Sequence, residues 1–129
     1  MITLNQRSTD RLKSVHQDLR RIIERAAKIS KMAFIVTEGI RTLERQKELL
    51  KLGATRTLKS RHLTGHAVDL APLDAAGKVR WDWPLFYTLA ATVKQAAADC
   101  AIPIEWGGDW TGGFKDGPHF QLPWKSYPK

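Results

Sequence analysis

The stretch SRHLTGHAVDL, residues 60–70, places two histidines and an aspartate around a glycine, and it can form either one helix or a turn followed by a strand. On a continuous helix, His62, His66 and Asp69 would share one face. Gly65 interrupts such a helix, however, and the apolar run that follows is more typical of a strand. In that second interpretation His62 comes from a loop or turn, Asp69 comes from a strand, and a third partner comes from a distant segment. The residues alone leave both arrangements open.

Two imidazoles and one carboxylate form a donor set that suits zinc, and a catalytic zinc keeps its fourth position for water. The chain offers two further histidines. His16 lies on the polar side of the first predicted helix, so we expect it at the surface. His119, in DGPHFQL, precedes an apolar end and should face a specific partner. A lone histidine there would more often be a hydrogen-bonded core residue, but stretch 60–70 makes His119 a candidate for the distant ligand.

Other polar residues suggest catalytic roles around such a metal. Asp116, three residues before His119, is a candidate general base, although KDGP is equally typical of a simple turn. Glu105 is the rival carboxylate. Arg41 follows an apolar strand-like run, where a guanidinium can stabilise an oxyanion or grip a substrate carboxylate. Ser60 is a candidate for orienting a ligand or contacting the substrate.

Length and composition bound the organisation of the chain. With 129 residues, 43% of them hydrophobic and 26% charged, it can bury one core, so we expect a single domain. A formal net charge of +8 favours polyanionic surroundings such as nucleic acid, anionic lipid or an acidic wall polymer. The lone Cys100 excludes an intramolecular disulfide, and we expect it to be a buried structural thiol. The first residues lack the apolar segment of a signal peptide, which predicts synthesis in the cytoplasm.

Hydrophobic periodicity and turn residues predict an α+β fold, with helices packed on a small, mostly antiparallel sheet. The expected helices begin near residues 8–10, 41 and 82–84 and end near 29, 53 and 101. The expected strands cover 33–40 and 67–73, with a possible return strand at 79–82 and short strand-like pieces in the tail. The basic segment 54–62 is expected to be a loop.

Two motifs, in this order, resemble those of a known family. The first is Ser-x-His-x-x-Gly-x-Ala-x-Asp, and about fifty residues later comes Asp-x-Pro-His-Phe, here at Ser60, His62, Gly65, Ala67, Asp69 and 116–120. With EGIRTLERQKELLKLGAT before them, the chain from Phe34 to Gln121 resembles the L-alanyl-D-glutamate peptidases of phage endolysins. That family is grouped with D-alanyl-D-alanine carboxypeptidases and dipeptidases, and it shares a fold with the hedgehog signalling domain.

The resemblance implies a role for each matching residue. His62, Asp69 and His119 match zinc ligands, with one Zn²⁺ per chain, so the helical triad is disfavoured. Asp116 matches the carboxylate that activates water, and Arg41 matches the residue that polarises the scissile carbonyl.

A second set of residues is expected to contact the substrate. Ser60 matches a serine that helps to hold it, and Gln46 matches a polar position in the helix after the arginine. His66 falls at a variable position and is a bystander or a substrate contact. Trp106 and Trp110 flank GGD and are expected to wall the groove. The other tryptophans are expected to fill the core or cover its edges, namely Trp81, Trp83 and Trp124.

The sequence therefore predicts a zinc metallopeptidase that hydrolyses the L-alanyl-D-glutamate bond of peptidoglycan stem peptides and lyses bacteria. A D-alanyl-D-alanine carboxypeptidase or dipeptidase is the alternative within the class, and a basic nucleic-acid-binding module is the alternative outside it. We expect residues 1–129 to form one catalytic domain without a separate wall-binding domain. Peptidoglycan is the expected partner of a monomer that binds no nucleic acid, does not insert stably into membranes and reaches the wall from the host cytoplasm, with a holin assisting its release.

Overall fold

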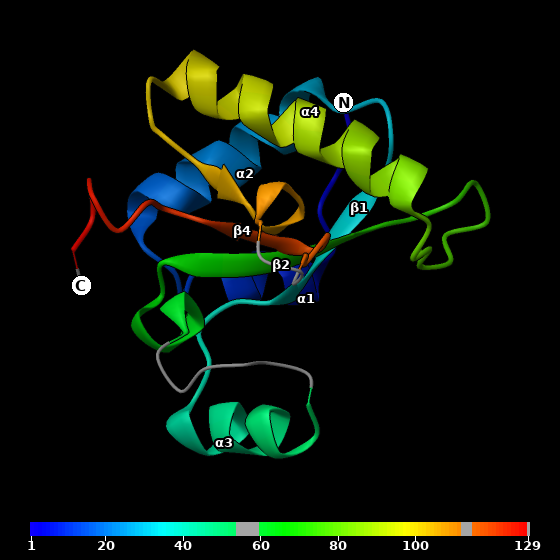
Figure 1. Cartoon of the computed structure of the whole chain (residues 1–129). Helices are drawn as coiled ribbons and strands as arrows, with labels where there is room; N and C mark the ends of the chain where they lie inside the picture. Colours follow the sequence, from blue (N-terminus) through cyan, green and yellow to red (C-terminus); the bar gives the residue numbers. More distant parts are fainter. Residues whose placement is uncertain (54–59, 112–114, 129) are drawn as a thin grey trace.

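The computed structural model describes residues 1–53, 60–111 and 115–128 (Figure 1). Segment 54–59 of the predicted basic loop lies outside the described residues. In chain order the elements are α1 (Gln6–Leu12), α2 (Gln17–Ile29), β1 (Phe34–Glu38), α3 (Leu43–Lys51), the 3₁₀ helix η1 (Arg61–Thr64), β2 (Ala67–Pro72), α4 (Trp83–Cys100), β3 (Glu105–Trp106), the 3₁₀ helix η2 (Gly107–Asp109) and β4 (His119–Gln121).

The strands form one antiparallel sheet in the order β1-β2-β4-β3. β2 is central: it pairs with β1 on one side and with β4, from almost fifty residues further along the chain, on the other. In the β2–β4 pairing Asp69 lies directly opposite His119. The predicted α+β class is confirmed, and the predicted antiparallel sheet is present.

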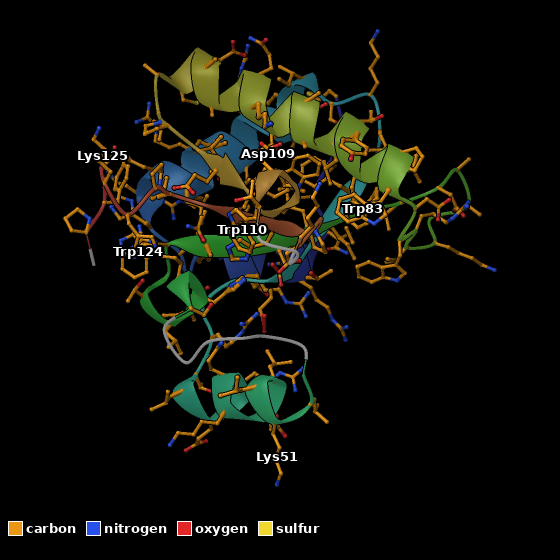
Figure 2. The ribbon with its side chains drawn as sticks, in the orientation of Figure 1. Lys51, Trp83, Asp109, Trp110, Trp124 and Lys125 are labelled. Atoms are coloured by element: carbon orange, nitrogen blue, oxygen red, sulfur yellow. The ribbon has the colours of Figure 1, made fainter. Side chains whose placement is uncertain are left out.

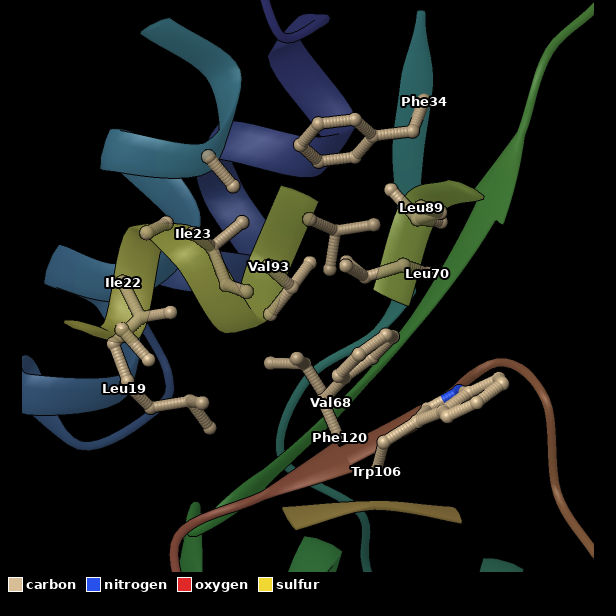
Figure 3. Close-up of a cluster of buried hydrophobic side chains, with 14 of the residues drawn as sticks. Leu19, Ile22, Ile23, Phe34, Val68, Leu70, Leu89, Val93, Trp106 and Phe120 are labelled. Carbon is tan, nitrogen blue, oxygen red and sulfur yellow. The ribbon is translucent and has the colours of Figure 1, made fainter. Parts of the chain in front are cut away.

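The core lies between one face of this sheet and the helices α2 and α4 (Figure 3). Because side chains alternate along a strand, Val68 and Leu70 of β2 and Phe120 of β4 point into this core. The same alternation directs Asp69 and His119 to the opposite face. α3 lies on that side of the sheet, away from α2 and α4 (Figure 1). The hydrophobic core thus fixes the strands whose other face carries the candidate site.

The predicted single helix from residues 8–10 to 29 is wrong, because the chain breaks between α1 and α2. Ser14 and His16 lie in the break, where the His16 N–H donates to the Gly65 carbonyl at 2.8 Å. The Ser14 hydroxyl accepts from the Ile40 N–H at 3.0 Å. The His16 side chain then caps α2 by accepting from the Asp18 N–H. Long-range partners therefore divide a segment whose hydrophobic periodicity continues through the break.

α3 forms where it was predicted, but not by burying its leucines. Thr42 caps its first turn by accepting from the Arg45 N–H at 3.1 Å. Leu43 and Leu50 are exposed, whereas Gln46 is fully buried. The residue that α3 buries most completely is therefore polar, so this helix contributes little to the hydrophobic core.

The remaining predictions are met to different degrees. α4 begins after Asp82 with Pro84 in its first turn, as expected, and ends at Ala101 in the left-handed conformation. The possible return strand at 79–82 reduces to one bridge between Leu73 and Val79. Cys100 is half-buried and packs against the core.

Among the described residues, no helix has the length and apolar character needed to cross a membrane.

Candidate metal centre and catalytic site

His62 is held by the short helix η1, whose two ends are both defined locally. The Ser60 hydroxyl caps its start by accepting from the His62 N–H at 3.2 Å. Gly65 ends it with φ 75°, a conformation that L side chains rarely adopt. The imidazole Nδ1 lies 2.9 Å from the Gly39 carbonyl, which can only accept, so Nδ1 carries the proton. Nε2 consequently faces Asp69.

His119 is oriented in the same manner, but with the two nitrogens exchanged. Its Nε2 lies 2.8 Å from the Gln121 amide oxygen, two residues further along β4 on the same face. Its Nδ1 faces Asp69 Oδ1 at 3.5 Å. Each imidazole thus binds an outer acceptor with one nitrogen and directs the other toward the same carboxylate.

Asp69 lies between the two rings. His62 Nε2 is 3.1 Å from Asp69 Oδ1, and the two imidazole centroids are 5.0 Å apart. Burial by itself would raise the pKa of Asp69, but hydrogen bonds with His119 and His62 outweigh it and hold that pKa far below its usual range. Burial would lower the pKa of His119, whereas its bond with Asp69 raises it. The cluster is therefore electrostatically coupled, with an ionised carboxylate at its centre.

The donor set fits a metal ion. One ligand atom from each of His62, Asp69 and His119 lies within 4.8 Å of the others. Two imidazoles and a carboxylate leave a fourth tetrahedral position open, as catalytic zinc sites do. Outer acceptors such as the Gly39 carbonyl and Gln121 are the partners that orient metal-binding histidines in proteins. The three residues that the sequence motifs single out are thus brought together as a possible metal-binding triad.

Arg41 lies against this triad and is held by its own segment of chain. Its Nε donates to Glu38 at 2.9 Å, Nη2 also pairs with Glu38, and Nη1 donates to Gln46 at 2.7 Å. Nη2 lies 3.7 Å from Asp69 Oδ2. The Arg41 N–H donates to the His62 carbonyl at 2.8 Å, which joins the two segments. Gln46, predicted as a substrate contact, is buried and accepts this hydrogen bond from Arg41.

Asp116 is a half-buried carboxylate beside the triad. Its backbone is fixed by Gly107, where an added Cβ would lie 2.3 Å from the Asp116 carbonyl oxygen, so only glycine fits. Burial raises the pKa of Asp116, and the neighbouring Asp69 charge raises it further, while His119, His62 and Arg41 oppose the rise. A carboxyl group with a raised pKa beside one with a lowered pKa is typical of acid–base sites.

A cavity of about 430 Å³ adjoins the triad on the His119 side. Ser60 and Trp110, both predicted to contact substrate, line it together with Glu105. The Trp110 ring centroid lies 4.9 Å from that of His119. In Figure 2, Trp110 lies beside the middle of the sheet, with Trp83 and Trp124 on opposite sides of it. Ser60, Trp110 and Trp124, which line the cavity, can form one wall of a substrate site.

Two predicted substrate contacts lie elsewhere. Trp106 is 3% exposed, stacks on Phe120 in the core and donates its indole N–H to the Gly117 carbonyl at 2.7 Å. His66 faces away from the triad, with Nδ1 2.6 Å from Thr64 Oγ1 and its ring 5.5 Å from that of His16. The interpretation of Trp106 is therefore corrected, because it is a core residue, whereas the contacts of His66 fit the first of its two expected roles, that of a bystander.

Sequence reasoning missed three residues that shape the site. Gln121 orients His119, and its position two residues along the same strand was the available signal. Glu38 binds Arg41 from three residues away, a spacing visible in EGIR. Arg61 is buried and lines the cavity, but no local signal separates it from the basic loop that precedes it.

Comparison with known proteins gives consistent matches over nearly the whole chain. The family described as phage L-alanyl-D-glutamate peptidase matches residues 1–122. The L-alanyl-D-glutamate peptidase of Escherichia phage T5 is 30% identical, over 89% of this chain and 93% of the relative. The peptidoglycan L-alanyl-D-glutamate endopeptidase CwlK of Bacillus subtilis (strain 168) is also 30% identical, over 84% of this chain and 75% of the relative.

A solved structure has the same fold. The crystal structure of the Serratia marcescens L-Ala D-Glu endopeptidase ChiX superposes with a TM-score of 0.91 and 45% sequence identity, covering 98% of this chain and 95% of that one. Fold, triad and relatives together define a peptidase that acts on peptidoglycan, as predicted. The chain belongs to the phage L-alanyl-D-glutamate peptidase family.

Proposed function

We propose that this chain is a zinc-dependent endopeptidase that hydrolyses the amide bond between L-alanine and D-glutamate in peptidoglycan stem peptides. The observation that carries the proposal is the triad of His62, Asp69 and His119, in which each imidazole is oriented by its own outer acceptor. Zinc held by these residues would supply a Lewis acid and lower the pKa of a bound water molecule.

Asp116 is the proposed general base and acid. Its raised pKa makes it a stronger proton acceptor than an ordinary carboxylate at the pH where it is ionised. It takes a proton from the attacking water and then donates that proton to the D-glutamate nitrogen as the carbon–nitrogen bond breaks. The products are a free alanine carboxylate and a new D-glutamate amine, so the proton balance closes.

Arg41 is the proposed oxyanion-stabilising residue. Among the described residues its hydrogen bonds use three of the five N–H groups, which leaves donors for a developing negative charge. Glu38 and Gln46 hold the guanidinium in place before substrate arrives, and such preorganisation is the main source of electrostatic catalysis.

Paired variants test the division between metal ligands and acid–base residue. His119→Ala should lose both bound zinc and hydrolysis, whereas Asp116→Asn should keep zinc and lose about 10²–10⁴-fold in kcat. His66→Ala is the matched control, because His66 lies four residues from His62 but outside the triad, and it should keep both. Zinc is measured in the purified proteins, and hydrolysis is followed with purified sacculi.

Mass spectrometry of the released fragments identifies the bond. New N-terminal D-glutamate supports the proposal, whereas release of D-alanine alone would favour a D-alanyl-D-alanine peptidase. A zinc-free protein that stays fully active in the presence of a chelator, or an Asp116→Asn variant with unchanged kcat, would refute the mechanism.

A further inference from the structure

The cavity beside the triad contains a charged residue that the proposed mechanism does not use. Arg61 lines this cavity together with His119, Trp110 and Trp124. Because His119 also belongs to the triad, a substrate bound at the metal would extend directly into the cavity. Whatever enters it would therefore be part of the substrate close to the scissile bond.

Arg61 is only 2% exposed, and its guanidinium is anchored to the C-terminal segment. Nη2 donates to the carbonyls of Leu122 at 2.8 Å and Tyr127 at 2.7 Å, and Nε donates to Leu122 at 3.3 Å. These acceptors are neutral. Among the described residues, Arg61 Nη1 has no hydrogen-bond partner, although it is buried. A buried guanidinium nitrogen without an acceptor is costly, so its persistence suggests an acceptor that arrives with a ligand.

The leaving side of the substrate has the matching charge. D-glutamate joins the scissile amide through its amine, so both of its carboxyl groups lie beyond that bond. When one carboxyl continues the peptide, the other remains as a free carboxylate. Guanidinium groups bind carboxylates through strong, charge-assisted hydrogen bonds, particularly where water is largely excluded.

We propose that Arg61 binds the free carboxylate of the substrate's D-glutamate residue and thereby sets specificity for an acidic residue after the scissile bond. This inference rests on the proposed function. Trp124, whose ring lies 4.1 Å from the Arg61 guanidinium carbon, covers the cation in the absence of substrate. Trp124 is itself half exposed and lines the same cavity, so its ring lies between the Arg61 guanidinium and solvent on that side.

Glu105 allows a second test of the proposal, in which the expected change in carboxylate binding has the opposite direction. Its carboxylate lines the same cavity, where it opposes a second negative charge. Removing the charge of Glu105 should therefore strengthen carboxylate binding, whereas removing the charge of Arg61 should weaken it. A general defect in folding cannot produce these opposite effects in two variants of one cavity.

The test uses two synthetic stem peptides with the same scissile bond, one with the free D-glutamate carboxylate and one with the corresponding carboxamide. We expect the full-length wild-type chain to prefer the carboxylate by about tenfold or more in kcat/KM, mainly through KM. Arg61→Gln should bring this ratio close to one, and Glu105→Gln should increase it. The ratio of the two kcat/KM values is measured on one enzyme preparation, so a partial loss of folded protein lowers both values equally and leaves the ratio unchanged.

Each outcome is decisive. A wild-type enzyme that cleaves both peptides equally well would overturn the role of Arg61 but leave the proposed function intact, whereas failure to cleave either would count against that function. If Arg61→Gln does not fold, wild type and Glu105→Gln still decide the question. A ratio that Glu105→Gln leaves unchanged or lowers would overturn a carboxylate site in this cavity.

Discussion

Arg41 and Arg61 both keep their guanidinium groups largely out of solvent, yet their partners differ. Arg41 is bound by a carboxylate and an amide from its own segment, Glu38 and Gln46. Arg61 is bound by neutral main-chain carbonyls from the other end of the chain, and its Nη1 has no acceptor among the described residues. Arg41 is thus held in position by a paired carboxylate, whereas Arg61 makes its hydrogen bonds to neutral carbonyls and has Glu105 as a charged neighbour in the cavity. The contrast matches the two roles proposed above, oxyanion stabilisation for Arg41 and carboxylate binding for Arg61.

The largest effect should come from breaking the Arg41 side of this comparison. Lysine cannot reproduce a fork that binds Glu38 and Gln46 together, so Arg41→Lys should lower kcat by about 10²–10³-fold. Zinc content and the thermal unfolding midpoint should change little. Steady-state kinetics on both synthetic peptides checks this, and an equal loss on both is expected because the oxyanion is common to them. A kcat within threefold of wild type would remove Arg41 from the mechanism.

A smaller effect should follow from loosening Arg41 without replacing it. A hydrogen bond to a charged group contributes about 1.5–3 kcal/mol, so Gln46→Leu should lower kcat about tenfold or more. Gln46→Glu restores an acceptor and should recover part of the loss, which a purely structural role for Gln46 would not predict.

Thr42→Ala, at the N-cap of the same helix, is the control. It removes the cap of α3 and should cost about 1 kcal/mol of stability without a comparable fall in kcat. If Thr42→Ala and Gln46→Leu lowered kcat equally, Gln46 would be acting through the stability of α3 rather than through Arg41.

The smallest expected effect is the change in stability on removing the Trp124 ring, which packs against the Arg61 guanidinium. Trp124→Ala removes the ring that lies 4.1 Å from the guanidinium carbon and should lower the free energy of unfolding by about 0.5–1 kcal/mol. Denaturant titration measures the change. In an Arg61→Lys background the same substitution should have a smaller effect, because the two side chains interact directly. Strict additivity would show that the ring and the cation are independent.

The parts of the fold that the sequence predicted are those specified by neighbouring residues. The apolar run after Gly65 predicts β2, and Asp82 with Pro84 predicts the start of α4. Once β2 is a strand, His62 and Asp69 must come from different elements, and the third member of the triad must come from elsewhere. The family resemblance supplied His119, which the structure brings opposite Asp69.

The parts that the sequence did not predict depend on distant partners. Leu12 and Val15 continue the hydrophobic stripe of α2, so only the contacts of Ser14 and His16 with later segments reveal the break. Trp106 and Trp110 have similar neighbours in sequence. The two-residue strand β3 is too short for an alternation pattern that would show which tryptophan faces the core. The carbonyl that accepts from the Trp106 indole belongs to Gly117, eleven residues later in the sequence.

The pairing of Asp69 with His119 across β2 and β4 makes the candidate metal site depend on the register between these two strands. The two residues are fifty positions apart, and a shift of one residue in the pairing would turn His119 toward α2 and α4. An ion that binds both side chains therefore also selects the strand register. Metal added during refolding should increase the yield of correctly paired chains, since a ligand that binds one register stabilises it at the expense of the others.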